Sequence, residues 1–210
     1  MSQEVNRVDI FYCGGEGQDS VSTASFIISS NKKIKEIAKC TPKKNHCLCL
    51  YEGNVYCFGG SSDVVERYIT FANTWEKLAQ PSESIGPSSA VAIDQGILIA
   101  PFKRNYLLFY NVQANKYLKI SNTPLSSNVS KLLLKTKTAI FCLSKNKIYQ
   151  SDLEGKVWKQ VGNPISDLNW CSIGSPKTIR DKIYFLLDDI SLHCFCFTDF
   201  TVIPLSLRSN

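Results

Sequence analysis

The chain has 210 residues, of which 44% are hydrophobic and 11% aromatic, and its formal net charge is +6. This composition supplies enough apolar surface for a packed core and excludes an intrinsically disordered chain. The longest apolar runs are far shorter than the ~20 residues that a membrane-spanning helix needs. Residues 1–8 are polar and lack the apolar segment of a secretory signal, so a soluble, cytoplasmic protein is expected.

Short apolar runs separated by turn residues recur along the chain with a period near 42 residues. Each period ends in a short segment that begins with, or close to, a large apolar residue. The lead residues are Ile34, Trp75, Tyr117, Trp158 and Phe200, which are spaced by 41 or 42 residues. A constant period of this size indicates a repeat architecture, in which one structural unit is copied along the chain.

The second period is the clearest copy and contains four β-rich runs joined by turns of glycine and asparagine. These runs span residues 46–51, 55–58, 64–71 and 75–79. The pattern is typical of a four-stranded antiparallel meander. A meander of this size cannot bury both of its faces alone, whereas copies stacked around an axis can. The sequence therefore predicts an all-β fold, a β-propeller of about five four-stranded blades.

The other copies follow the same order within one domain over residues 1–210. The expected blades span residues 8–40, 46–80, 88–121, 130–163 and 171–206. First strands are expected at 47–51, 89–93, 132–136 and 171–173, and second strands at 10–13, 55–58, 97–100, 139–143 and 183–187. Third strands are expected at 25–29, 64–71, 106–112, 147–151 and 191–197, and fourth strands at 33–37, 75–79, 116–120, 157–161 and 199–203.

The first blade is expected to be incomplete, because no first strand precedes Ile10. Three outcomes follow for the ring: a five-bladed ring with an irregular seam, an open arc, or an incomplete gene product. An open arc or a poorly sealed ring is favoured. The free edge that such a ring leaves invites pairing with another chain.

The residues of the second copy carry a resemblance to a known family. An apolar run, Gly59-Gly60, a third strand containing Tyr68 and a fourth strand opened by Trp75 resemble the kelch repeat. The positions that match the family's pattern in the other copies are Gly14, Gly15, Tyr110, Tyr117, Trp158 and, loosely, Phe200. The double glycine is absent from the third, fourth and fifth copies, which read Ala100-Pro101, Leu143-Ser144 and Leu187-Asp188.

The kelch resemblance implies a non-catalytic protein-interaction module, a scaffold or adaptor, that binds its partner through loops between the strands. In a propeller the loops after second strands share one rim with the loops that lead into first strands, and binding residues concentrate on loops. The residues expected to bind a partner on this rim are Lys43, Lys44, Lys103, Arg104, Asp167 and Trp170.

Positive charge is concentrated in the middle of the chain. Residues 95–151 contain nine lysine and arginine residues and no aspartate or glutamate. A one-sided field of this kind steers acidic partners, so we expect a protein with an acidic surface to face the third and fourth blades. Nucleic acid is disfavoured as a partner, because its recognition ordinarily uses aromatic side chains exposed beside basic ones. The aromatic residues of this stretch are expected to lie in the core. A plain solvated surface remains the alternative.

The nine cysteines and two histidines show no sequence pattern of a metal or catalytic site. The pairs Cys47/Cys49 and Cys194/Cys196 are closer in sequence than zinc ligands usually are, so we expect buried, inert thiols. His193 follows Ser191 and lies near Asp188 and Asp189, but neighbours in sequence do not make a catalytic triad. We therefore expect no metal, no cofactor and no enzymatic activity. Two alternatives stay open: a propeller enzyme of the oxidase or hydrolase type, and a degenerate repeat protein without independent function.

Overall fold

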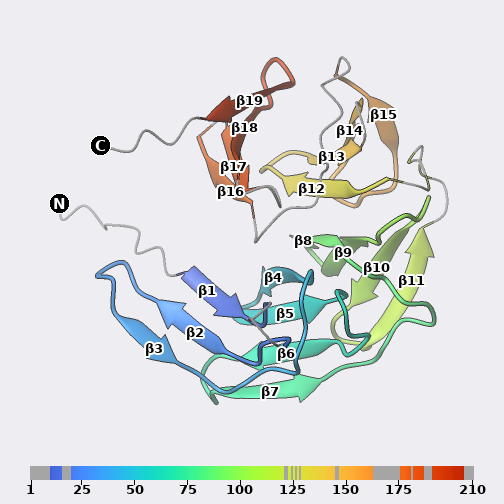
Figure 1. The fold of residues 1–210 in the computed structure, drawn as a ribbon. Coiled ribbons are helices and arrows are strands. Elements are labelled where there is room, and N and C mark those ends of the chain that lie inside the picture. The colour runs from blue at the N-terminus through green and yellow to red at the C-terminus, as the bar shows by residue number, and fades with distance from the viewer. Residues whose placement is uncertain are drawn as a thin grey trace.

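The computed structural model describes residues 10–15, 20–120, 123, 125, 127, 129–144, 147–162, 176–180, 182–186 and 191–205. The strands in these segments form five antiparallel sheets that follow one another around a common centre, and no helix occurs among them (Figure 1). This arrangement confirms the predicted all-β, five-bladed propeller. No segment of the described chain forms a helix that is long and apolar enough to cross a membrane.

Each blade pairs its strands in the order of the chain. Blade 1 has three strands, β1 (Ile10–Cys13), β2 (Ser25–Ile28) and β3 (Ile34–Glu36). Blade 2 consists of β4 (Cys47–Tyr51), β5 (Asn54–Phe58), β6 (Glu66–Ile69) and β7 (Thr74–Lys77). Blade 3 consists of β8 (Ser89–Ile93), β9 (Gly96–Ala100), β10 (Leu107–Asn111) and β11 (Lys116–Ile120). Blade 4 consists of β12 (Lys131–Lys135), β13 (Ile140–Ser144), β14 (Lys147–Ser151) and β15 (Trp158–Gln160), and blade 5 of β16 (Lys177–Ile179), β17 (Lys182–Leu186), β18 (Leu192–Cys196) and β19 (Thr201–Leu205).

Most strands lie within one or two residues of their predicted bounds. One difference concerns the first strand of blade 5, which we expected at residues 171–173. Those residues lie outside the described part of the chain, and the sheet instead begins with β16, whose three residues are all exposed. An exposed strand without apolar alternation gives no periodic signal in the sequence.

Consecutive blades are held together by buried apolar clusters to which both blades contribute. Representative members are Val55, Tyr68 and Ile37 between blades 1 and 2, Phe58 and Tyr110 between blades 2 and 3, Leu107 and Leu133 between blades 3 and 4, and Phe141 and Phe195 between blades 4 and 5. The predicted role of the repeated aromatic residues is visible in these clusters. Phe200 deviates from the repeat, since it precedes β19 instead of opening it, but its ring still packs 6.0 Å from that of Phe141.

The double glycines connect each of the first two blades to the segment that leads into the next blade. The Gly15 amide donates a hydrogen bond to the Lys43 carbonyl at 2.9 Å, and the Gly60 amide donates one to the Gly86 carbonyl at 2.8 Å. All four glycines have positive φ, which glycine adopts without a steric penalty. The kelch-like signature therefore has a physical role in blades 1 and 2.

A second repeated link joins Tyr68, Asn73 and the preceding blade. The Asn73 side-chain oxygen accepts hydrogen bonds from the Tyr68 hydroxyl at 2.8 Å and from the Ala38 amide of blade 1 at 2.9 Å. Asn115 repeats the arrangement one blade later, with the Tyr110 hydroxyl at 2.7 Å and the Ala79 amide at 2.9 Å. Both asparagines precede a fourth strand with positive φ, of 52° and 49°.

Replacing Asn73 with glycine is expected to lower the free energy of unfolding by about 1–3 kcal/mol, because the buried Tyr68 hydroxyl and the Ala38 amide lose their acceptor. Glycine keeps the positive φ, so the change isolates the side-chain bonds. Urea denaturation followed by circular dichroism measures the loss. Asn45→Gly is the control, since Asn45 is exposed and also has positive φ. Equal stabilities of the two variants would contradict the proposed link.

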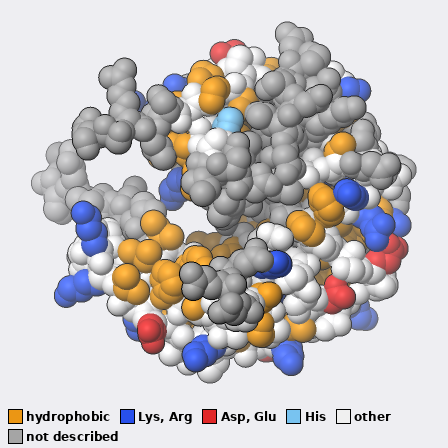
Figure 2. All heavy atoms as spheres, viewed as in Figure 1, with side chains coloured by type: hydrophobic (Ala, Val, Ile, Leu, Met, Phe, Trp, Pro, Cys, Tyr) orange, Lys and Arg blue, Asp and Glu red, His pale blue; other side chains and the backbone are white. Residues whose placement is uncertain are grey.

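Blade 1 keeps an unpaired strand edge among the described residues. β1 pairs with β2 alone, and no buried apolar cluster of the described chain joins blade 1 to blade 5. Hydrophobic side chains gather on the surface over blade 1, at the lower left of Figure 2. Within the strands of this blade, Ile10 and Ile34 are 59% and 68% exposed. Blade 1 is therefore anchored in the described structure by its contacts with blade 2.

Candidate functional site

The rim residues predicted to bind a partner occupy different environments. Lys103 lies in the loop between β9 and β10, is exposed, and has a positive φ of 53°. Its neighbour Arg104 keeps 42% of its side chain exposed and lies 3.6 Å from Glu83. Lys44 is half-buried in the segment before β4. These three residues lie on loops at the same end of their blades, as the propeller register predicts.

Lys43 differs from the expectation that it presents its charge to a partner. Its side chain is 0% exposed, and its ammonium lies 3.2 Å from the Glu66 carboxylate and 2.6 Å from the Val64 carbonyl. The same carboxylate accepts hydrogen bonds from the amide and the hydroxyl of Thr41. Lys43 therefore fixes the segment between blades 1 and 2 from within the protein, and its charge does not reach the solvent. Asp167 and Trp170 lie outside the described residues, and their roles stay predictions.

The basic stretch of the chain is only partly displayed on the surface. Lys131 is buried, and desolvation lowers the pKa of its ammonium. Lys135 donates a hydrogen bond to the Ala92 carbonyl at 2.7 Å. The ammonium of Lys119 lies 3.9 Å above the ring of Tyr106. Several lysine side chains of this stretch therefore make contacts within the protein, and only part of its positive charge is available to a partner.

The paired cysteines fit the expectation of buried thiols in the case of Cys49, Cys194 and Cys196. Burial also raises the pKa of Cys47 to about 12, although its thiol lies near the Ser88 hydroxyl. The second histidine, His193, is buried on β18, stacks on Phe185 and shares a hydrogen bond of 2.7 Å with the Ser191 hydroxyl. Asp188 and Asp189 lie outside the described residues.

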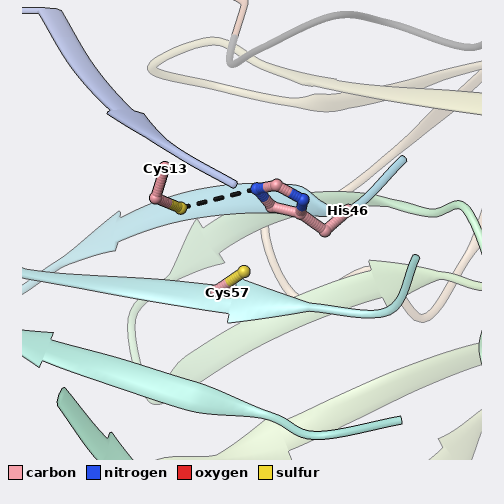
Figure 3. A group of neighbouring side chains, drawn as sticks. All are labelled: Cys13, His46 and Cys57. Atoms are coloured by element: carbon pink, nitrogen blue, oxygen red, sulfur yellow. Dashed lines mark hydrogen bonds between the residues drawn. The ribbon is translucent and has the colours of Figure 1, made fainter. Parts of the chain in front are cut away.

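A cluster of thiols and one imidazole lies between blades 1 and 2, and sequence reasoning missed it (Figure 3). Cys13 ends β1, His46 directly precedes β4, and Cys57 lies near the end of β5. Their three ligand atoms all lie within 4.8 Å of one another, with 3.5 Å between the Cys13 Sγ and the His46 Nε2. Cys40 packs in the same buried group as Cys13 and Cys57. We call these four residues the thiol–imidazole cluster.

Hydrogen bonds inside the cluster shift the acidity of its members. Its hydrogen bond with Cys40, reinforced by a second with Cys57, raises the pKa of the Cys13 thiol. The same contact with Cys13 lowers the pKa of Cys40 to about 6. Burial opposes ionisation of Cys57, but hydrogen bonds from Cys13 and His46 outweigh it and lower the pKa of that thiol. Burial likewise disfavours the charged His46, yet its bond to Cys57 raises the pKa of the imidazole.

The cluster was invisible in the sequence because its members come from three separate segments at no recognised ligand spacing. Cys13 and Cys57 lie in short apolar runs, where a cysteine ordinarily serves as a small apolar residue. Their positions in the repeat are a usable signal: Cys13 lies one residue and Cys57 two residues before a double glycine at the end of a second strand, and His46 directly precedes a first strand. In a propeller these positions meet at one end of adjacent blades.

Comparison with protein-family models and with curated proteins gives no match for this chain. The fold defines its class, a five-bladed β-propeller, and the kelch resemblance rests on the residues of the repeat alone. Loops on rigid all-β frameworks of this kind commonly carry binding residues.

Proposed function

We propose that this chain is a non-catalytic protein-interaction module of a degenerate kelch type, which binds the acidic surface of a partner protein through Lys44, Lys103 and Arg104. The observation that carries the proposal is the exposed Lys103 beside Arg104 on a loop of the rim. Among the described residues, Glu83 is the acidic group paired with Arg104, at 3.6 Å. Exposed basic groups of this kind attract an acidic surface at long range and add specificity to binding.

The rigidity of the supporting strands favours the same function. β9 and β10 flank the loop; all five residues of β9 and three of the five residues of β10 are buried. A rigid support reduces the entropy that the loop loses when it binds, so that affinity comes from few contacts. The left-handed conformation of Lys103 adds a local strain of the kind that clusters at functional loops.

The double substitution Lys103→Glu/Arg104→Glu is expected to reduce partner binding at least about tenfold, because it reverses the charge that faces the acidic surface. Affinity purification with quantitative mass spectrometry identifies the partner, and titration of that purified partner at rising salt concentration measures affinity. Binding by the unmodified chain should weaken as salt rises, since salt screens exposed charges.

Lys116→Glu is the matched control, because Lys116 is exposed on β11, away from the loop of Lys103, and changes the net charge in the same direction. Partner recovery should be retained in this variant. Recovery that is unchanged by the double substitution, or equally reduced by the control, would refute the rim as the binding surface.

A further inference from the structure

We propose that Cys13, His46 and Cys57 bind a zinc ion that ties blade 1 to blade 2. Two thiols and one imidazole are ligands that zinc prefers, and their donor atoms already converge within 4.8 Å. Each comes from a different segment, as Figure 3 shows, so that an ion between them links β1 to β5 and to the start of β4. The site is independent of the proposed partner-binding rim.

The distances fit a tetrahedral ion with small adjustments. Zinc bonds of about 2.3 Å to sulfur and about 2.0–2.1 Å to nitrogen place tetrahedral ligand atoms about 3.5–3.8 Å apart. The Cys13 Sγ and the His46 Nε2 are separated by 3.5 Å, which already matches this range. The remaining separations are at most 4.8 Å, so side-chain movements of about 1 Å bring these atoms into the tetrahedral range.

The fourth position is assigned to Cys40. This residue is 5% exposed and belongs to the same buried group as Cys13 at 4% and Cys57 at 0%. Its thiol now donates a hydrogen bond to the Thr23 carbonyl at 3.7 Å and stands outside the three ligand atoms that converge within 4.8 Å, so its side chain would have to turn toward the ion. Structural zinc sites are closed by four protein ligands, whereas catalytic sites keep one position for water. Burial of all three thiols therefore favours a structural ion.

The glycines around His46 create the space in which its ring is held. A Cβ added to Gly14 would lie 2.9 Å from the His46 Cε1, and one added to Gly60 would lie 2.9 Å from the His46 amide nitrogen. Gly14 thus makes room for the imidazole ring, and Gly60 makes room for the backbone of the same residue. The ring directs Nε2 toward the Cys13 thiol, while its buried Nδ1 has no hydrogen-bond partner among the described residues.

An ion at this place strengthens the one side on which the described structure anchors blade 1, its contact with blade 2. Blade 1 has three strands, and no described cluster connects it to blade 5. Because a metal that binds only the folded protein stabilises it, the ion would hold the terminal blade against its neighbour. The thiols lose their protons as they bind.

The test measures zinc in the full chain, purified under reducing conditions from zinc-supplemented cells. We expect about one zinc per chain, falling below about 0.2 in Cys13→Ser, His46→Ala and Cys57→Ser, because each removes a ligand. Cys142→Ser is the control: Cys142 is a buried free thiol in blade 4, and its replacement should leave the zinc content unchanged.

The role of Cys40 has its own test. In Cys40→Ser the zinc affinity is expected to fall about 10- to 100-fold or more, and full affinity in that variant would overturn the role of Cys40.

A second measurement uses the unmodified chain, so it tests the proposal even if the substituted variants fail to fold. Cobalt should produce thiolate charge-transfer absorption and the intense visible bands of a tetrahedral site, and zinc should displace it. Zinc-free folded protein, a cobalt spectrum without thiolate bands, or a disulfide among Cys13, Cys40 and Cys57 in the isolated protein would overturn the proposal.

Discussion

Replacing Gly59 with alanine is expected to lower the free energy of unfolding by about 3–5 kcal/mol, a large part of the stability of an ordinary domain. Gly59 has a φ of +66°, and an added Cβ would lie 2.1 Å from the Gly86 carbonyl oxygen. That carbonyl accepts the hydrogen bond from the Gly60 amide. The methyl group therefore adds backbone strain and also displaces the acceptor of a link to blade 3.

Gly53→Ala separates these two effects. Gly53 also has a positive φ, of +75°, but an added Cβ would meet no atom within 4 Å. This variant should lose only about 1–2 kcal/mol, the cost of the left-handed conformation for a residue with a side chain. Urea midpoints of both variants, followed by tryptophan fluorescence, give the comparison. If Gly53→Ala and Gly59→Ala lose the same stability, the carbonyl contact has no energetic role.

The architecture was predictable because its signal is repeated. Each blade is specified by apolar runs and turns at one period, so errors in single strands do not alter the count of blades. β11 (Lys116–Ile120) and β14 (Lys147–Ser151) were predicted with correct bounds, since each forms part of a clear meander. β16 escaped prediction because its exposed residues do not alternate between apolar and polar.

The environment of individual side chains was harder to predict than the blades. Lys43 and Lys44 are adjacent lysines in a loop, which ordinarily indicates solvent exposure. Only the fold reveals that Lys43 meets Glu66, because the ion pair connects the segment before blade 2 with the third strand of that blade. The thiol–imidazole cluster was hidden for the same reason: its members converge through contacts between blades, and such contacts leave no spacing pattern along the chain.

Blades 1 and 2 are joined by several kinds of hydrogen bond in addition to the packing of the repeated aromatic residues. They include the Gly15 amide on the Lys43 carbonyl, the Asn73 side chain on the Ala38 amide, and the Trp75 indole, which donates to the Ala38 carbonyl at 2.8 Å. All of them hold the three-stranded blade to its neighbour. The ion pair of Lys43 with Glu66 belongs to this set, because it fixes the connecting segment itself.

Replacing Lys43 with methionine is expected to lower the free energy of unfolding by about 3–5 kcal/mol, because removal of one partner leaves a buried charge uncompensated. Methionine retains most of the side-chain volume, so the loss reports on charge and hydrogen bonding and not on a cavity. Glu66, 4% exposed in its side chain, would keep its bonds to Thr41 but lose the ammonium at 3.2 Å. Urea denaturation of the purified variant measures the effect.

A double-mutant cycle with Glu66→Gln distinguishes a paired charge from simple packing. Glutamine retains an acceptor for Thr41 without the negative charge, so the double variant Lys43→Met/Glu66→Gln should be more stable than the sum of the single losses predicts. Glu76→Gln is the exposed control: its pair with Arg67 leaves 48% and 27% of the two side chains accessible, and its loss should cost at most about 1 kcal/mol. Additive losses in the cycle, or a loss in Glu76→Gln equal to that in Lys43→Met, would show that burial does not strengthen the Lys43–Glu66 pair.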